Sequence, residues 1–312
     1  MRDQNPTDNA TRIPFLALAL LAIACLLAPV LPVQAQDTQK IAYLVSDRRI
    51  PFWDILARGI ESKAHELGLQ LSVYSAENDK KTELENTVRA IQDEVAGIII
   101  SPINSSTAVT ILKLAKGAGI PVVVADIGAE SDNFVSYISS NNFQGAYELG
   151  QILARRMQQL GWQQGRVGIV AIPQERANGK ARTAGFLQAL NEAKIKSSDL
   201  RQQVDFSYAE TYQHSLDLIR SEPNLRAIWL QGSDRYQAAL DAIRDSGKEN
   251  EILLICFDAE PEFLELIPQA VLTGAAMQQP FLIGELAVDK LYRHLHGEVV
   301  KKKVQLPILA VS

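Results

Sequence analysis

The sequence predicts an α/β protein built from two similar domains, each a parallel sheet covered by helices. Short apolar runs alternate with segments that have helical spacing, and this order restarts after Asn142. A chain of 312 residues, of which 47% are hydrophobic, is long enough for two domains with a core each. The pattern therefore predicts that the two halves of the chain have the same order of strands and helices.

Each of five short apolar runs ends at a polar residue, which is typical of strands buried on both faces. The runs and their polar ends are 41–45 before Ser46, 97–100 before Ser101, 121–125 before Asp126, 227–230 before 231–234, and 252–257 before Asp258. In open parallel sheets, ligands bind just beyond the carboxyl ends of the strands. We therefore expect these polar residues to line a single site.

The remaining elements follow from periodicity and from turn residues. Helices are predicted at 52–67, 81–94, 105–117, 145–160, 180–193, 211–221, 236–246 and 280–295. Further strands are predicted at 69–74, 135–139, 166–172, 202–206 and 271–277. The final run, 305–311, contains Pro307, which suits an edge strand.

The first 35 residues read as a secretory signal peptide. A polar start with Arg2 and Arg12 precedes an apolar stretch at 13–31, and small residues then precede Gln36. The length of the stretch leaves an uncleaved membrane anchor as the alternative, and Cys25 is a weaker candidate for a lipidated cysteine. Cleavage of the leader predicts export to the periplasm.

Composition and motifs point to binding rather than to catalysis. The sequence has no G-x-S-x-G, no G-x-x-x-x-G-K-[ST] and no G-x-G-x-x-G after a strand. The four histidines fall in or beside predicted helices, and after leader cleavage Cys256 would be the one cysteine left. A net charge of -5 with scattered basic residues argues against nucleic acid as a partner. We expect no catalytic residue, no metal ligand and no cofactor.

Aromatic and charged residues beside the strand ends are the candidate ligand contacts. Phe52 and Trp53 open the first helix, where they either pack the core or form a flat wall for a sugar ring. Asp126 and Asp258 either shape their turns or accept hydrogen bonds from ligand hydroxyls. Arg182 is either a solvated helix residue or a donor aimed into the cleft.

In order and spacing, these pieces resemble the ribose-binding branch of the type I periplasmic solute-binding proteins, from Lys40 to about Leu309. The matching pieces are Ser46 with Pro51-Phe52-Trp53, Ile120-Pro121-Val122 before Asp126, Ser139-Ser140-Asn141-Asn142 with Gly145, Arg182-Thr183-Ala184-Gly185-Phe186, Ser233-Asp234, Phe257-Asp258 and Gln278-Gln279-Pro280. The resemblance implies two Rossmann-like domains joined by a three-strand hinge. It places the N-terminal lobe at 38–140 plus 279–305 and the C-terminal lobe at 141–278 plus 306–312.

The resemblance also implies roles for individual residues. Phe52, Trp53 and Phe206 would sandwich the ligand. Hydrogen bonds would come from Asp126, Arg182, Asp258 and Gln278, with Gln278 otherwise a plain linker residue. Ser46 is a further candidate, and an extra residue near Gly232 leaves the choice between Ser233 and Asp234 open.

The sequence departs from the ribose binder at three positions. Ile50 and Ser101 each stand where it has an asparagine, and Ile127 stands where it has an arginine. These changes predict a more apolar pocket and argue against ribose itself.

We therefore expect a monomeric periplasmic binding protein for a monosaccharide or a sugar-like molecule. It would close about its hinge and deliver the ligand to the membrane permease of an ABC importer. The alternative is an adaptor that reports to a sensor kinase or a chemoreceptor. A repressor of related architecture would carry a helix-turn-helix where this chain has its apolar leader.

Overall fold

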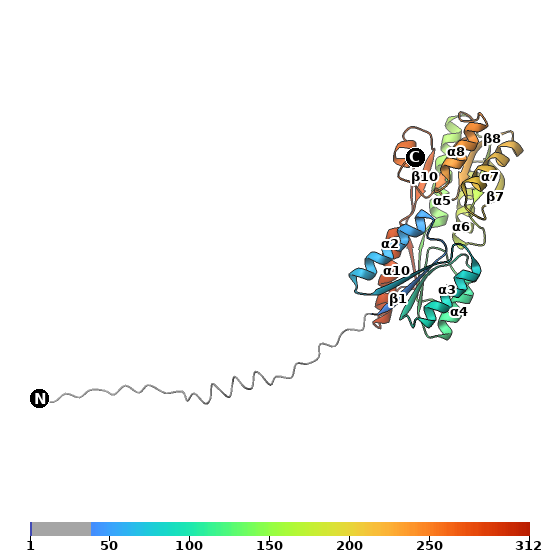
Figure 1. Cartoon of the computed structure of the whole chain (residues 1–312). Coiled ribbons are helices and arrows are strands. Elements are labelled where there is room, and N and C mark those ends of the chain that lie inside the picture. Colours follow the sequence, from blue (N-terminus) through green and yellow to red (C-terminus); the bar gives the residue numbers. More distant parts are fainter. Residues whose placement is uncertain (2–38) are drawn as a thin grey trace. The chain divides into compact units, whose positions relative to one another are not determined.

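The computed structural model describes residue 1 and residues 39–312 and contains two six-stranded sheets (Figure 1). The first sheet has the order β11-β5-β4-β3-β1-β2. Its strands are β1 (Lys40–Val45), β2 (Gln70–Ser75), β3 (Gly97–Ser101), β4 (Val122–Ala125), β5 (Ser136–Ser140) and β11 (Lys303–Leu306). All its strand pairs are parallel, as the continuous apolar runs predict.

The second sheet has the equivalent order, β12-β10-β9-β8-β6-β7. Its strands are β6 (Arg166–Ala171), β7 (Lys196–Gln202), β8 (Leu225–Leu230), β9 (Leu253–Phe257), β10 (Gly274–Met277) and β12 (Leu309–Val311). Its pairs are parallel except for the edge pair of β10 and β12. The matching strand orders confirm the predicted α/β fold, in which one arrangement occurs twice.

Helices pack against both sheets. The helices that pack with the first sheet are α2 (Pro51–Glu66), α3 (Lys80–Gln92), α4 (Thr107–Gly117) and α10 (Pro280–Leu295). Those of the second are α5 (Asn142–Gln159), α6 (Ala177–Glu192), α7 (Tyr208–Ser221), α8 (Tyr236–Asp245) and α9 (Phe263–Leu266). We call each sheet with its helices the first lobe and the second lobe. Both lie in one compact unit, Thr38–Ser312.

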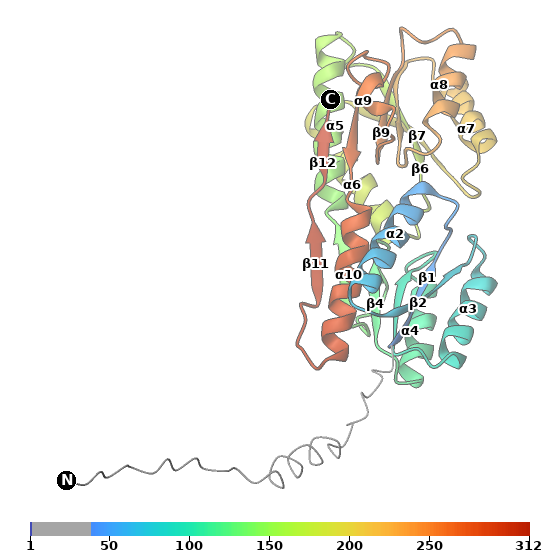
Figure 2. The same ribbon diagram turned by 60° about the vertical axis from the view of Figure 1, so that its left-hand side comes forward.

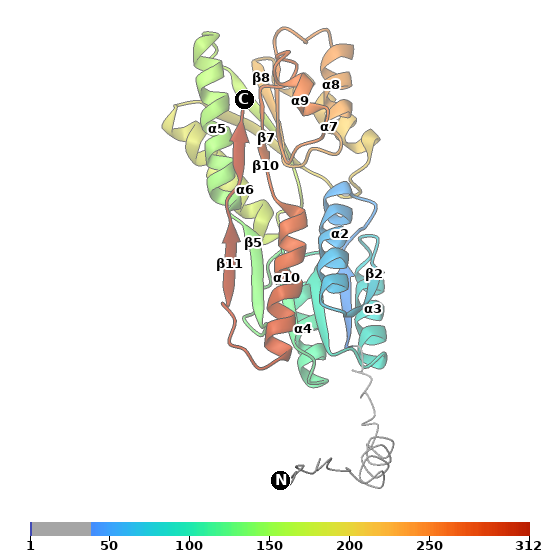
Figure 3. The same cartoon turned by 90° about the vertical axis from the view of Figure 1, so that its left-hand side faces the viewer.

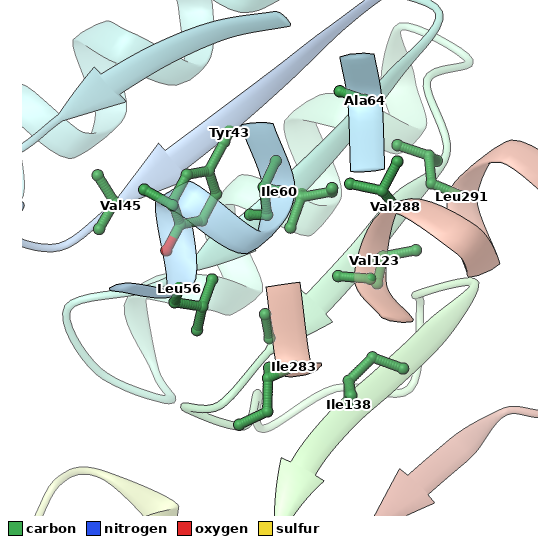
Figure 4. Close-up of a cluster of buried hydrophobic side chains, with 14 of the residues drawn as sticks. Tyr43, Val45, Leu56, Ile60, Ala64, Val123, Ile138, Ile283, Val288 and Leu291 are labelled. Atoms are coloured by element: carbon green, nitrogen blue, oxygen red, sulfur yellow. The ribbon is translucent and has the colours of Figure 1, made fainter. Parts of the chain in front are cut away.

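The first sheet is apolar on both faces because each face packs on helices. Along β1, Tyr43 and Val45 lie in one core cluster with side chains of α2 and α10, as Figure 4 shows. Leu44, which points to the other face, packs in a second cluster with side chains of α3 and α4. Alternate burial on two covered faces is why the run shows no polar alternation.

The chain crosses between the lobes three times. It passes from β5 to α5 at Asn141, from β10 to α10 at 278–279, and from β11 to β12 at 307–308 (Figures 2 and 3). Pro307 lies in the last crossing, so the predicted edge strand is split into two strands, each at the edge of its own sheet.

In each lobe, one helix pair approaches so closely that only glycine fits. A Cβ atom on Gly59 of α2 would lie 2.1 Å from the carbonyl oxygen of Phe281 in α10. A Cβ atom on Gly185 of α6 would lie at the same distance from the carbonyl oxygen of Phe143 in α5. The two contacts occupy corresponding places in the two halves of the chain.

The strand predicted at 202–206 is wrong beyond its first residue, because β7 ends at Gln202. Glu210 accepts hydrogen bonds from the backbone N–H groups of Val204 and Phe206 at 2.6 and 2.9 Å, and Phe206 has a φ of 56°. Gln203 N–H still donates to the carbonyl of Ala171 in β6 at 2.8 Å, but the donors that follow it bond to the Glu210 side chain, so the segment is a loop. The edge strand β7 escaped prediction because its sequence is largely polar and exposed.

The predicted signal peptide and its alternatives fall on residues outside the described part of the chain. Within the described part, no helix is both long enough and apolar enough to cross a membrane.

Candidate ligand-binding site

A cavity of about 520 Å³ lies between the two lobes, at the carboxyl ends of their strands. This volume lies within the range of about 300–1,000 Å³ that is usual for small-molecule sites. Most of the predicted contacts line it: Phe52, Trp53, Asp126, Arg182, Phe206, Ser233, Asp234, Asp258 and Gln278. The structure therefore brings side chains from distant parts of the sequence to one place.

Ser46 does not belong to the cavity lining. Its side chain is fully buried, its N–H donates to the carbonyl of Ser101, and its own carbonyl accepts from the N–H of Asn78. This position supports the loop that follows β1 rather than a contact with a ligand.

Asp126 and Asp258 occupy equivalent positions in the two lobes. Each follows its strand directly, β4 or β9, and each has a positive φ, 62° and 66°. Their N–H groups donate to the carbonyls of Ile138 and Ala276 at 2.8 and 2.9 Å. Left-handed backbone is uncommon for residues other than glycine, but Asp and Asn tolerate it better than most. The left-handed turn at each strand end accompanies a carboxylate that lines the cavity.

Arg182 of α6 lies beside both carboxylates and is held on several sides. Its Nε donates to Asn142 Oδ1 at 2.8 Å, and its Nη1 donates to the carbonyl of Gln231 at 2.6 Å. The guanidinium stacks 3.9 Å from the ring centre of Phe257, and Nη1 lies 3.6 Å from Asp258 Oδ2. A buried guanidinium with this many fixed partners is a preorganised donor.

The electrostatics of the cavity raise the pKa values of its carboxyl groups. Burial raises the pKa of Asp126 to about 6, with Arg182 opposing the shift and Asp258 adding to it. Burial also raises the pKa of Asp258, again opposed by Arg182. In the other direction, burial lowers the pKa of the Arg182 guanidinium. These shifts follow from placing several charged groups together away from water.

Three acceptor atoms of the cavity lining are buried and lack a hydrogen-bond partner among the described residues: Asp126 Oδ1, Asp234 Oδ2 and Gln278 Oε1. Asp126 Oδ2 accepts from Asn178 Nδ2 at 2.9 Å, but Asp126 Oδ1 has no donor. Gln278 Nε2 donates to Asp258 Oδ1 at 2.6 Å, which leaves Gln278 Oε1 without a donor. Buried acceptors without donors are costly, so the arrangement suits a ligand that donates hydrogen bonds.

Sequence reasoning missed Arg176 and Asn178, which belong to the second lobe and contact the first. Arg176 Nε donates to the carbonyl of Ile103 at 2.8 Å, and its guanidinium lies 5.2 Å from the ring centre of Phe206. The Arg176 side chain is 4% exposed, and burial lowers its pKa to about 10. No local pattern marks these residues, since a charged residue before a helix usually faces solvent.

The apolar wall of the cavity contains Phe52 and Trp53, packed edge to face with ring centres 4.9 Å apart. Of the three positions that depart from the ribose binder, Ile50 lines the cavity. Ser101 and Ile127 are fully buried outside the lining, and Ser101 accepts a hydrogen bond from Tyr43. Among these three positions, the expected gain in apolar character therefore comes from Ile50.

The fold and the site define a periplasmic binding protein. A model of the periplasmic binding protein domain matches residues 41–298, so the chain belongs to this family, and within it to the ribose-binding-like type I proteins. The family comprises solute-binding proteins rather than enzymes.

Similar proteins are known from several bacteria. The ribose import binding protein of Bacillus subtilis (strain 168) is 29% identical over 268 residues, which cover 86% of this chain and 85% of that protein. The ribose import binding protein of Haemophilus influenzae is 29% identical and covers 89% and 92%. A solute-binding protein from Actinobacillus succinogenes with bound D-allose has the same fold, with a TM-score of 0.79, 19% identity, and coverage of 88% of this chain and 98% of that one.

Proposed function

We propose that this protein captures a monosaccharide or a sugar-like molecule in the periplasm and passes it, unchanged, to an ABC importer. The proposal depends on one observation: Asp126 of the first lobe and Asp258 of the second lobe line the same cavity. Ligand hydroxyl groups that donate to both carboxylates would satisfy acceptors of both lobes at once.

Binding of this kind is coupled to closure of the lobes. A ligand that contacts both lobes binds the closed state more tightly than the open one and shifts the population toward closure. We propose that the lobes, 38–140 plus 279–305 and 141–278 plus 306–312, move about the three crossings near Asn141, Gln278 and Pro307. The closed monomer is then the form that the permease recognises.

The relatives support a sugar and an importer. The two ribose proteins named above are described as import binding proteins, and further relatives are described as binding D-allose and importing D-apiose. These descriptions favour a permease over a sensor kinase as the partner. Export would follow from cleavage of the leader at residues 1–35.

The test is a thermal-shift screen of the mature protein against pentoses, hexoses, deoxy sugars and polyols, followed by calorimetry of every hit. Asp258→Asn should weaken a hit by about tenfold or more, because a hydrogen bond to a charged group contributes about 1.5–3 kcal/mol. Asp132→Asn, which changes an exposed carboxylate outside the cavity lining, is the matched control and should bind as the unmodified protein does. A sugar that binds both variants equally would refute the proposed site.

A further inference from the structure

The charged residues of the cavity do not balance. Its lining contains the carboxylates of Asp126, Asp234, Asp258 and Glu260 but only two cationic side chains, Arg176 and Arg182. Arg235, outside the lining, pairs with Asp234 at 3.1 Å, and Arg182 lies 3.6 Å from Asp258. With Arg235 included, four carboxylates face three guanidinium groups, which leaves one carboxylate in excess.

Asp126 and Glu260 are the two carboxylates of the lining that form no ion pair within 4.0 Å among the described residues. Arg182 and Arg176 attract Asp126 from farther away, whereas the charged groups that act on Glu260 are carboxylates. Glu260 Oε1 accepts the hydroxyl of Ser233 at 2.6 Å. Asp234 and Asp258 are near enough to act on it electrostatically. A partly buried carboxylate beside two others is stabilised by a nearby positive charge.

The fully buried side-chain atoms of the cavity lining that lack a hydrogen-bond partner among the described residues are all acceptors. Asp126 is 1% exposed, lines the same cavity from the opposite lobe, and has no donor for Oδ1. Gln278 Oε1 is also without a donor. No buried donor of the lining lacks a partner in the described structure. A carboxylate or phosphate on the ligand would add acceptors and negative charge to a site that already has both in excess.

The aromatic rings fit a cation as well. Phe52, Trp53 and Phe206 line the cavity, and the faces of aromatic rings attract positive charge. Carboxylates together with aromatic faces form a recurring environment for ammonium groups, whereas a neutral sugar needs the aromatic wall but no excess carboxylate.

Building on the proposed sugar-binding function, we propose that the natural ligand is a polyhydroxy compound with one protonated amine, and that Glu260 receives the amine. The hydroxyl groups donate to Asp126 and Gln278, and the ammonium group adds the one positive charge that the cavity lacks. Sugar acids and sugar phosphates are excluded by the same charge.

The test uses sugars of one shape that differ in charge. Calorimetry of the mature protein compares D-glucose, D-glucosamine, N-acetyl-D-glucosamine and D-glucuronate, and then the galactose counterparts. We expect the amine to bind at least about tenfold more tightly than its neutral parent, as a charge-assisted hydrogen bond predicts. The N-acetyl form should lose this gain, and the acid should not bind.

A variant tests whether Glu260 is the residue that causes the preference for the amine. Glu260→Gln should lower the affinity for the amino sugar to that of the neutral sugar and leave the neutral sugar unchanged. Glu262→Gln, the same change at an exposed position two residues away, is the control and should change neither. Equal loss for both sugars in Glu260→Gln would mean a structural role and overturn the inference.

The outcomes separate this inference from the proposed function. A neutral sugar or a sugar acid that binds as tightly as the amine overturns the inference and leaves the sugar-binding function intact. If no sugar of any charge binds, that function fails, and choline is compared with 3,3-dimethyl-1-butanol, its uncharged analogue. Binding of choline alone supports the requirement for a cation, and binding of neither or of both overturns it.

Discussion

Replacing Arg176 by methionine should shift the lobes toward the open state. Arg176 Nε reaches from the second lobe to the carbonyl of Ile103 in the first lobe, at 2.8 Å and almost fully buried. A hydrogen bond from a charged donor contributes about 1.5–3 kcal/mol, and the lost partner also leaves the Ile103 carbonyl unsatisfied in the closed state. Methionine keeps an apolar contact with Phe206, so the change removes mainly the polar contact.

The expected net loss lies just below that range. Burial lowers the pKa of Arg176 to about 10, which means that desolvation offsets part of what the hydrogen bond contributes. A net loss of about 1.4 kcal/mol in the closed state corresponds to about a tenfold weaker ligand, since the apparent affinity scales with the closed fraction.

Two measurements follow the prediction. Small-angle scattering, with and without the ligand that the screen identifies, reports opening, and stopped-flow fluorescence reports the dissociation rate, which should rise about tenfold. Urea unfolding checks that the variant remains folded.

The control changes a neighbouring contact between the lobes. Glu175 accepts from Asn104 Nδ2 at 3.1 Å, but its side chain is 64% exposed. Glu175→Gln should change the affinity by less than about threefold, because exposed pairs contribute little. If Arg176→Met retained both the affinity and the scattering profile of the unmodified protein, the cross-lobe contact would not stabilise closure.

Four further predictions concern the binding residues, the pH dependence of stability and the helix contacts. Asp126→Asn keeps a residue that tolerates positive φ, yet calorimetry should show about tenfold weaker binding or more, because the charged acceptor is lost. In the unmodified protein the pKa of Asp126 is about 6, above its value of about 3.9 in the unfolded chain. Between these two pH values the folded state therefore binds more protons than the unfolded state. Urea titrations should show the free energy of unfolding falling as the pH rises from about 4 to 6. Asp126→Asn should remove this contribution, and an unchanged slope would contradict it. Gly59→Ala and Gly185→Ala should each lower the urea midpoint, because the added Cβ would meet backbone atoms of the neighbouring helix. Gly117→Ala is the control: a Cβ there meets no atom within 4 Å, so the change should raise the free energy of unfolding by about 0.5–1 kcal/mol. Equal effects at the three sites would refute the close-contact argument. Trp53 lines the cavity, so its emission should shift on ligand binding and the shift should vanish in Trp53→Phe, and a shift that persists in the variant would come from another tryptophan.

The strand ends show how much of the site local sequence can predict. Asp126 and Asp258 were found because a polar residue directly after a doubly buried strand must leave the sheet at its carboxyl edge, where ligands bind. Phe206 came from a family resemblance over nearly the whole chain. For Arg182 and Gln278 the local sequence left a plain alternative open, and the resemblance implied the binding role. The structure places all three in the cavity lining.

The missed residues show where local sequence stops being informative. Arg176 donates a hydrogen bond to the carbonyl of Ile103, 73 residues away in the chain, and Asn178 donates one to Asp126, 52 residues away. Glu260 differs from the other carboxylates of the lining because the charged groups that act on it are themselves carboxylates, and this depends on where every other charge lies in the fold. In the sheet, β7 was missed because an edge strand has few apolar side chains to reveal its period.

The sequence by itself determined the two repeated parallel sheets, because burial on both faces requires continuous apolar runs whatever surrounds them. It also determined which strand ends carry carboxylates. Tertiary structure alone decided which charges meet across the cavity, which of them are paired and which acceptors are left free. These properties depend on how far apart side chains of the two lobes lie, and no periodic pattern in the sequence reports that distance.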